Sequence, residues 1–320
     1  MTDVVVVEDV WGPPFERLSA DFAVRRDAEA WSDPARLAAA LADARALVVR
    51  NRTRVTAELL ASARRLEVVA RAGVGLDNID VPAADAAGVV VVAPLGANAV
   101  SVAEHALALA LAVARRVVPL DGDVRRGGWR REPGVELAGG TWGLLSAGAT
   151  ARATGRLAHA LGMTVLAHDP YVDPGDPALT GIRLVGLDEL VARSDVLSVH
   201  LPATDATCGL VDARLLAAAK PGLILVNCGR GEVVDEDALA DALADGRIAG
   251  AGLDVRANEP PTPGRLEALP NVVLTPHVAG ITVAAQRRVG EILCHDIRAV
   301  LDGRPAEHHV TRTARPAVTT

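Results

Sequence analysis

Three short polar segments in the second half of the chain carry side chains that are able to do chemistry together. They hold Arg230 in NCGRG, Glu259 in RANEP and His277 in TPHVAG. A histidine exchanges protons close to neutral pH, and the planar fork of an arginine binds carboxylates. Each segment lies near the end of a predicted strand, and open parallel sheets bind ligands at the carboxyl ends of their strands. We therefore expect the three segments to face one crevice.

A second candidate site is the segment TWGLLSAGATARATGRLAHALGMTVLAHDP, whose order of strand, tight turn, helix, strand and acid suits a dinucleotide pyrophosphate. Its glycine fingerprint is damaged: only Gly148 remains, with Ser146 and Ala151 at the outer glycine positions. A plain strand–turn–helix would explain that glycine equally well. However, Asp169 follows Gly148 by 21 residues (169 − 148), where a carboxylate accepts hydrogen bonds from ribose hydroxyls. The next two residues carry no cation for a 2′-phosphate, so NAD is favoured over NADP.

Short β-branched runs alternate with Ala/Leu-rich helical segments, a pattern that predicts parallel sheets covered by helices on both faces. Strands are expected at residues 4–7, 46–49, 68–71, 89–92, 143–145, 164–167, 196–200, 223–227, 250–253 and 272–274. Helices are expected at residues 34–42, 56–63, 102–117, 149–161, 187–193, 212–218, 235–245 and 283–301. These ten strands exceed what one such domain needs, so we expect an α/β protein with two doubly wound, Rossmann-like domains.

Composition and charge argue against several classes of function. The chain has 320 residues, of which 50% are hydrophobic, enough for two domain cores. A formal net charge of −7 and an aromatic content of 2% disfavour nucleic acid as a partner. The cysteines Cys208, Cys228 and Cys294 are widely spaced and odd in number, which predicts neither disulfides nor a metal site. The longest apolar runs are too short to cross a bilayer, so we expect a cytoplasmic protein.

The chain resembles the D-isomer-specific 2-hydroxyacid dehydrogenases, and within them the short D-3-phosphoglycerate dehydrogenase branch that lacks regulatory domains. The resemblance runs from about residue 46 to residue 310. The distances of 29 residues from Arg230 to Glu259 (259 − 230) and 18 from Glu259 to His277 (277 − 259) are typical of that family. The matching stretches are VVRNRTRVTAELL, RAGVGLDNIDVPAA, NAVSVAEHALALALAVARR, LAGGTWGLL, GMTVLAHDPYV, SDVLSVHLPAT, LILVNCGRGEVVDEDAL, AGLDV followed by EPP, and NVVLTPHVAG.

This resemblance implies an NAD-dependent enzyme that interconverts a D-2-hydroxy acid and its 2-keto acid. His277 would be the general acid/base, Glu259 would hold its imidazole, and Arg230 would bind the substrate carboxylate and polarise the carbonyl. His105 is expected to play a structural or supporting role. Cofactor contacts are implied at Gly148, Ala149, Thr150, Asp169, Pro170, His200, Leu201, Pro202, Cys228, Gly229, Arg230, Asp254, His277 and Gly280.

The resemblance also implies where the substrate binds. The backbone N–H groups of Val74 and Gly75 would cradle its carboxylate, while Arg50 and Arg71 match positions that face phosphate in the phosphoglycerate branch. We therefore expect a second anionic group, as in 3-phosphohydroxypyruvate, a phosphonate such as phosphonopyruvate, or a dicarboxylate. For the neighbouring arginines at 52 and 54, a solvated face is an equal alternative. The implied substrate contacts are Arg50, Asn51, Arg71, Val74, Gly75, Asn98, Arg230 and His277.

The expected organisation is a discontinuous, flavodoxin-like substrate-binding domain and an NAD-binding Rossmann domain, with the active site in the cleft between them. The first would comprise residues 1–97 plus 282–310, the second residues 98–281, and residues 311–320 would form a disordered tail. A long helical segment over residues 98–116 would bridge the domains, and the apolar helix expected at residues 102–117 would serve a homodimer contact. The alternative is a catalytically weak NAD(H)-sensing or scaffold protein of the same fold, which the damaged glycine fingerprint favours.

Overall fold

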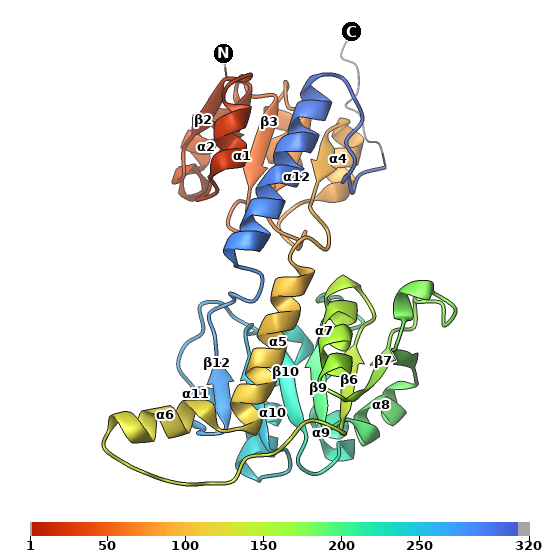
Figure 1. Ribbon diagram of the computed structural model, residues 1–320. Helices are drawn as coiled ribbons and strands as arrows, with labels where there is room; N and C mark the ends of the chain where they lie inside the picture. The colour runs from red at the N-terminus through yellow and green to blue at the C-terminus, as the bar shows by residue number, and fades with distance from the viewer. Residues whose placement is uncertain (1, 313–320) are drawn as a thin grey trace. The chain divides into compact units, whose positions relative to one another are not determined.

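The computed structural model describes residues 2–312, and the chain divides into two compact units (Figure 1). Unit 1 combines Met1–Asn98 with Val283–Thr320, and unit 2 is Ala99–Thr282. The chain therefore enters unit 2 once and returns to unit 1 afterwards. Within the described residues, no helix combines the length and the apolar character that a membrane span requires.

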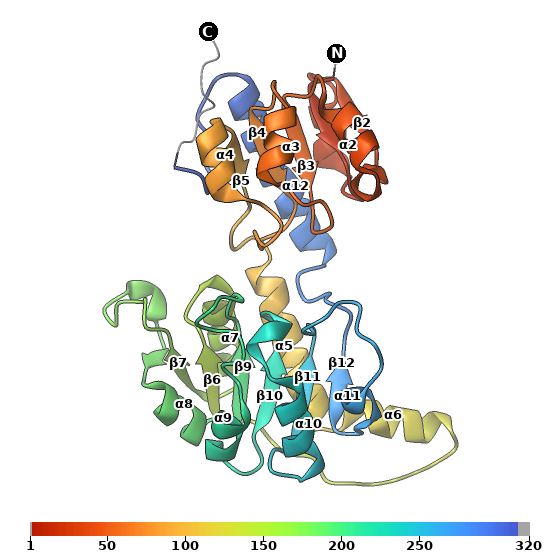
Figure 2. The ribbon, with the colours of Figure 1, turned by 180° about the vertical axis from the view of Figure 1, so that it is seen from behind.

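Unit 1 is built on a parallel sheet of five strands in the order β2-β1-β3-β4-β5. Alternate strand residues belong to two different apolar clusters, so both faces of the sheet are buried. Helices α1 and α12 cover one face (Figure 1), and α2, α3 and α4 cover the other (Figure 2). The elements are β1 Val4–Val6, α1 Pro13–Leu18, β2 Val24–Arg26, α2 Pro34–Leu41, β3 Ala46–Val49, α3 Ala57–Ser62, β4 Val68–Arg71, α4 Val81–Ala87, β5 Val90–Val92 and α12 Val283–Leu301.

Unit 2 is built on a parallel sheet of seven strands in the order β12-β11-β10-β9-β6-β7-β8. Helices α5 and α7 pack on one face, and α8, α9, α10 and α11 on the other. The elements are α5 Ala99–Ala114, α6 Val117–Arg125, β6 Thr141–Leu145, α7 Ala149–Ala160, β7 Thr164–His168, β8 Arg183–Leu184, α8 Leu187–Arg193, β9 Val196–Val199, α9 Ala213–Ala218, β10 Ile224–Asn227, α10 Glu236–Ala244, β11 Gly250–Leu253, α11 Arg265–Ala268 and β12 Val272–Leu274.

Helix α5 lies unusually close to the sheet because β11 presents glycines to it. A Cβ added to Gly250 would lie 2.5 Å from a methyl of Val113, and one added to Gly252 would lie 2.7 Å from the Cβ of Leu109. Both distances are shorter than real side chains tolerate, so these positions require glycine. The apolar face of α5 is thereby buried inside unit 2.

The fold class predicted from the sequence is confirmed, but three details of the elements differ. Strands β2 and β8 were missed because both are edge strands: β2 is mostly charged and β8 has only two residues. The expected helix over residues 98–116 is present as α5, which ends at Ala114. The helices α1, α4, α6 and α11 were not expected; α6 begins after Arg116, which takes a left-handed conformation (φ 54°). Of the expected tail, Thr311 accepts a hydrogen bond from the Val91 N–H (3.2 Å). The residues 313–320 lie outside the described part of the chain.

Candidate active site

The three polar segments lie side by side because they follow neighbouring strands. Strands β10, β11 and β12 are adjacent and parallel, so their carboxyl ends share one edge of the sheet. The segment after β12 brings the Nδ1 atom of His277 to 2.7 Å from the Oε2 atom of Glu259, which lies in the segment after β11. Arg230 lies in the segment after β10, where its Nη1 donates to the carbonyl of Gly229 (2.9 Å). The structure therefore joins Glu259 to His277 and places Arg230 in the segment beside them.

The contact between Glu259 and His277 defines which imidazole nitrogen is free. Burial opposes ionisation of Glu259, but hydrogen bonds from His277 and from the backbone N–H of Arg256 outweigh it and lower the pKa of this carboxyl. An ionised carboxylate only accepts hydrogen bonds, so the Nδ1 atom of His277 carries a proton. The Nε2 atom is left to exchange a proton with a ligand.

A buried carboxylate, Asp254, shapes the loop that carries His277. Asp254 is 1% exposed and accepts hydrogen bonds from the N–H groups of Val278 (2.9 Å) and Ala279 (2.8 Å) and from the hydroxyl of Thr275 (2.6 Å). The loop holds His277 in a left-handed conformation (φ 55°), which is uncommon for a residue other than glycine. Such strain persists only where the surroundings impose it, and it concentrates at functional sites.

His105, on α5, completes the support beneath this loop. Its Nε2 atom lies 2.9 Å from the hydroxyl of Thr275 and 3.4 Å from Asp254. Burial opposes ionisation of Asp254, but the hydrogen bonds from His105, Thr275 and the loop backbone outweigh it and lower the pKa of this carboxyl. Thr275 was not identified from the sequence, although its place two residues before the histidine was a usable signal.

The damaged glycine turn between β6 and α7 is held by its own side chains. Ser146 adopts φ 105°, a region that favours glycine, and its Oγ accepts the N–H of Gly148 (3.0 Å). The same hydroxyl donates weakly to Asp169 (3.4 Å), which also accepts the N–H of Ala147 (2.9 Å). The serine therefore uses one of the backbone donors that this turn would offer to a pyrophosphate. Ala151, at the third position of the fingerprint, is fully buried.

The remaining donors of this turn fit a dinucleotide. No side chain caps the N-terminus of α7, so the N–H groups at Ala149 and Thr150 remain in the uncapped first turn, where anions bind. Asp169 stands directly after the neighbouring strand β7, where its two carboxylate oxygens accept the N–H groups of Ala147 (2.9 Å) and Tyr171 (3.0 Å). These residues could hold a pyrophosphate and a ribose. In the described part of the chain, no group of three or more His, Cys, Asp or Glu side chains could hold a metal ion.

The other expected cofactor residues follow the same edge of the sheet. His200, Leu201 and Pro202 come directly after β9, and Cys228 and Gly229 directly after β10. A Cβ on Gly229 would lie 2.9 Å from the carbonyl oxygen of Leu201, so the two segments are in backbone contact. Burial raises the pKa of the Cys228 thiol, with the charge of Asp254 adding to the effect, which disfavours the nucleophilic thiolate form.

His200 is oriented by a chain of buried polar groups. The indole N–H of Trp142 donates to the hydroxyl of Ser198 (2.8 Å), and that hydroxyl lies 2.9 Å from the Nε2 atom of His200. Burial lowers the pKa of His200 to about 4, so the ring is neutral at physiological pH. The sequence did not identify Trp142 or Ser198 as partners of this histidine.

In unit 1, an unforeseen carboxylate organises the segment with the expected substrate arginine. Glu8 is 2% exposed and accepts four backbone N–H groups, from Arg50 (2.8 Å), Asn51 (3.1 Å), Arg52 (3.0 Å) and Thr53 (3.0 Å). Burial opposes ionisation of Glu8, but these hydrogen bonds outweigh it and lower its pKa. Its position just beyond the end of β1 was a signal for this role.

The arginines of unit 1 have different surroundings. The guanidinium of Arg71, at the end of β4, covers the α-carbon of Gly73, where an added Cβ would lie 1.6 Å from Nη1. It therefore lies beside the expected cradle at Val74 and Gly75. The guanidinium of Arg52 instead packs on the ring of Trp31, 4.7 Å from its centroid, which favours a structural role for this residue.

Comparison with known proteins bears out the resemblance. Residues 107–279 match the family model for the D-isomer specific 2-hydroxyacid dehydrogenase, NAD binding domain. The chain is 48% identical over 273 residues to a D-3-phosphoglycerate dehydrogenase of Mycobacterium tuberculosis, covering 85% of this chain and 52% of the relative. It is 40% identical over 308 residues to an (S)-sulfolactate dehydrogenase of Chromohalobacter salexigens, covering 95% of this chain and 100% of the relative. The chain therefore spans about half the length of the phosphoglycerate dehydrogenase but all of the sulfolactate dehydrogenase.

Among solved structures, an NADPH-dependent glyoxylate/hydroxypyruvate reductase of Sinorhizobium meliloti has a TM-score of 0.86 at 31% identity. The alignment covers 100% of this chain and 99% of that one. The similarity thus extends over both units, and the family model places the NAD-binding domain within unit 2. On these grounds, the chain belongs to the family of D-isomer specific 2-hydroxyacid dehydrogenases.

Proposed function

We propose that the protein is an NAD-dependent dehydrogenase that interconverts a D-2-hydroxy acid and its 2-keto acid. The observation that carries this proposal is the 2.7 Å contact between Glu259 and His277 at the sheet edge that Arg230 shares. When bound, the nicotinamide would supply or accept the hydride at the substrate carbon. The protein then has to bind the carboxylate, polarise the carbonyl and move one proton.

The three side chains divide these tasks. Arg230 binds the substrate carboxylate and polarises the carbonyl oxygen through its planar fork. In the direction of reduction, the Nε2 atom of His277 gives a proton to that oxygen, and in oxidation it takes the proton back. Glu259 stabilises the imidazolium through Nδ1 and fixes the orientation of the ring, as the carboxylate does in other histidine-based sites.

The substrate is proposed to carry a second anion, such as a phosphate or sulfonate. Support comes from Arg50 and Arg71, which lie at the carboxyl ends of the neighbouring strands β3 and β4 in unit 1. The names of two relatives point the same way, because 3-phosphoglycerate and sulfolactate are both 2-hydroxy acids with a second anionic group. We propose that unit 1 binds this second anionic group.

A substrate panel tests this proposal. The purified protein is mixed with NADH and with 3-phosphohydroxypyruvate, sulfopyruvate, phosphonopyruvate, oxaloacetate or pyruvate, and the loss of NADH absorbance is recorded. We expect turnover with at least one of the substrates that carry a second anion, and a lower kcat/KM with pyruvate. Absence of turnover with every keto acid, from protein that binds NADH, would contradict the enzymatic assignment.

An NAD(H)-sensing or scaffold protein is the second candidate, and one observation favours it. The Oγ atom of Ser146 accepts the N–H of Gly148, which removes a donor from the expected pyrophosphate site. Calorimetric titration with NADH separates the candidates when it is combined with the substrate panel. Binding without turnover would support a sensor, whereas binding with turnover would support the dehydrogenase.

We also propose that the protein forms a homodimer through α6 and the segment that follows it. This region reaches out from the body of unit 2 (Figure 1), and none of the α6 side chains is buried. Five of its apolar side chains are more than half exposed, namely Val117, Val118, Val124, Trp129 and Val135. A second copy would remove this apolar surface from water. The contact expected at residues 102–117 is less suited to this role, because the apolar face of α5 packs inside unit 2.

Light scattering coupled to size exclusion tests the dimer. We expect twice the mass of one chain for the native protein and a monomer for Val118→Asp combined with Trp129→Asp. A native protein that elutes as a monomer at micromolar concentration would contradict the proposal.

The free thiols of all three cysteines suit a reducing compartment, and we propose the cytoplasm as the place of action.

A further inference from the structure

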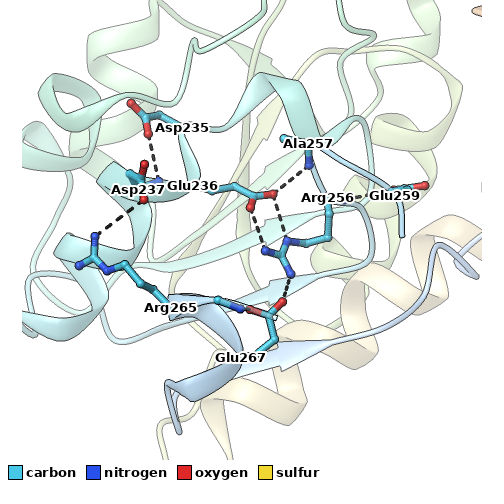
Figure 3. A network of polar contacts seen from close by, with 9 residues as sticks. Asp235, Glu236, Asp237, Arg256, Ala257, Glu259, Arg265 and Glu267 are labelled. Atoms are coloured by element: carbon cyan, nitrogen blue, oxygen red, sulfur yellow. Dashed lines mark hydrogen bonds and ion pairs between the residues drawn. The ribbon is translucent and has the colours of Figure 1, made fainter. Parts of the chain in front are cut away.

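Arg256 lies three residues before Glu259, and its guanidinium pairs with two acidic side chains, Glu236 and Glu267 (Figure 3). Its side chain is 10% exposed. The Nε and Nη2 atoms donate in parallel to the two carboxylate oxygens of Glu236 at 3.0 and 2.8 Å, and Nη1 donates to Glu267. The sequence assigned no role to this residue, and neither catalysis nor cofactor binding as described above uses it.

The backbone of the same short turn holds Glu259. The N–H of Arg256 donates to the Oε1 atom of Glu259 (3.1 Å), whose other oxygen contacts His277. The next N–H, that of Ala257, donates to Glu236 (2.9 Å). Glu236 therefore fixes both the side chain of Arg256 and the backbone that follows it, so the turn is anchored to the start of α10 at two points.

The segment that carries Arg230 packs directly against this turn. A Cβ added to Gly231 would lie 1.9 Å from the carbonyl carbon of Arg256 and 2.3 Å from the nitrogen of Ala257. Backbone atoms cannot yield at these distances, so only glycine permits the contact. A shift of the Arg256 turn would therefore move both the segment that carries Arg230 and the side chain of Glu259.

We propose that Arg256 is a positioning residue, which locks this turn to Glu236 and Glu267 and thereby holds Glu259 at hydrogen-bonding distance from His277. The guanidinium does not face the reacting groups; it acts through the backbone N–H that Glu259 accepts. The effect on turnover rests on the proposed dehydrogenase function, whereas the effect on the His277 ring does not.

Removing the guanidinium has two physical consequences. Glu236 and Glu267 lose the cation between them and repel each other, since the charge of each disfavours ionisation of the other. The turn is then free to move, and Glu259 loses a hydrogen bond that lowers its pKa. The acid limb of the kcat/KM profile, where Glu259 becomes protonated, should consequently move to higher pH.

The experiment compares Arg256→Met with Arg256→Lys and with a matched control, Arg265→Met. Arg265 lies on the nearby helix α11 and forms ion pairs with Asp237 (Figure 3) and with Asp241. Its replacement therefore also removes an arginine that is paired with acids. If Arg256→Met does not fold, Glu236→Gln is a second variant that weakens the attachment of the Arg256 turn to α10. The control should behave like the native protein.

Two readouts separate positioning from general stability. Two-bond ¹H–¹⁵N spectra of the free protein report which ring nitrogen of His277 carries the proton, with the signal assigned by a His277 variant. Steady-state kinetics over pH report kcat, KM and the acid limb. For Arg256→Met and Glu236→Gln we expect mixed His277 tautomers, an acid limb at higher pH and a kcat lowered about 10- to 100-fold, because a misplacement near 1 Å has effects of that order. The dissociation constant of NADH should be unchanged, and Arg256→Lys should recover part of kcat.

The proposal is overturned if Arg256→Met and Glu236→Gln leave the His277 ring signals and the acid limb as in the native protein, even with a lowered Tm. That result would give Arg256 a structural role only. If no keto acid is turned over by the native protein, the dehydrogenase function fails, while the His277 spectra still decide whether Arg256 positions Glu259.

Discussion

Replacing Ser146 by glycine should strengthen pyrophosphate binding at the turn before α7. In the native protein, the Ser146 hydroxyl accepts the N–H of Gly148 at 3.0 Å. The backbone of Ser146 also adopts φ 105°, a conformation that is strained for a residue with a side chain. A bound dinucleotide has to displace that hydroxyl before the N–H can reach a phosphate oxygen. Ser146→Gly removes both the competing acceptor and the backbone strain.

The two contributions have different sizes. A hydrogen bond from a backbone N–H to a charged oxygen is worth about 1.5–3 kcal/mol, which corresponds to an affinity gain of about 10- to 150-fold for NADH. Strain at this φ costs Ser146 about 1–3 kcal/mol. Relief of the strain is offset by the lost hydroxyl hydrogen bonds, each worth about 1 kcal/mol, and by the greater backbone entropy of an unfolded glycine, about 0.5–1 kcal/mol. Stability should therefore change little.

Ser146→Ala is the control that separates competition from strain. Alanine lacks the hydroxyl but keeps the Cβ, so the N–H of Gly148 is released while the strain remains. Isothermal titration with NADH should show tighter binding for both variants, and thermal unfolding should show a lowered Tm for Ser146→Ala only. The reasoning is refuted if neither variant binds NADH more tightly than the native protein.

Three further predictions concern other parts of the molecule. Glu8→Gln should destabilise the protein by about 2–4 kcal/mol in urea unfolding, because an amide cannot accept all four N–H groups of the turn after β3. The pKa of Glu8 in the folded protein lies below its ordinary value of 4.5. The ionised Glu8 therefore stabilises the fold fully above pH 4.5, and this stabilisation is lost as the pH falls through the folded-state pKa. Over this pH range, Glu8→Gln should lose less stability than the native protein. Arg50→Met or Arg71→Met should raise KM about 10-fold or more for keto acids with a second anion and leave KM for pyruvate unchanged. Equal effects on both kinds of substrate would count against a role of these arginines in binding the second anion. Gly252→Ala should lower stability by about 1–3 kcal/mol in the same unfolding assay, because its Cβ would lie 2.7 Å from Leu109; an unchanged Tm would show that α5 can shift.

The sequence predicted the buried strands well because their apolar runs are continuous. Strands such as β1 and β10 are fully buried, and in parallel sheets both faces are covered, so the run itself is the signal. Edge strands lack that signal: β2 carries two arginines and β8 only two residues. Helix α6, which follows the left-handed Arg116, was missed because its sequence VVPLDGDVR contains a proline and a glycine, which disfavour a helix.

Within the candidate site, the sequence predicted the chemical groups but not what holds them. The contact of Glu259 with His277 was implied by the family resemblance, and it depends on strands that are neighbours in the sheet. The supporting residues Glu8, Thr275 and Arg256 lie at the ends of strands or next to the catalytic segments, but the groups that they contact come from other parts of the chain. Their partners are fixed by tertiary packing, which periodicity and motifs do not encode.

The central claim is that His277, held by Glu259, moves the proton in a keto acid reduction. The most direct test is the kcat of His277→Asn with the best substrate of the panel, measured beside its NADH affinity and its Tm. Asparagine tolerates the left-handed backbone (φ 55°) of this position, so the loop should stay folded, but its amide does not exchange a proton. We predict a kcat lowered about 100- to 10,000-fold, with NADH affinity and Tm unchanged. A kcat within a few fold of the native value would contradict the account.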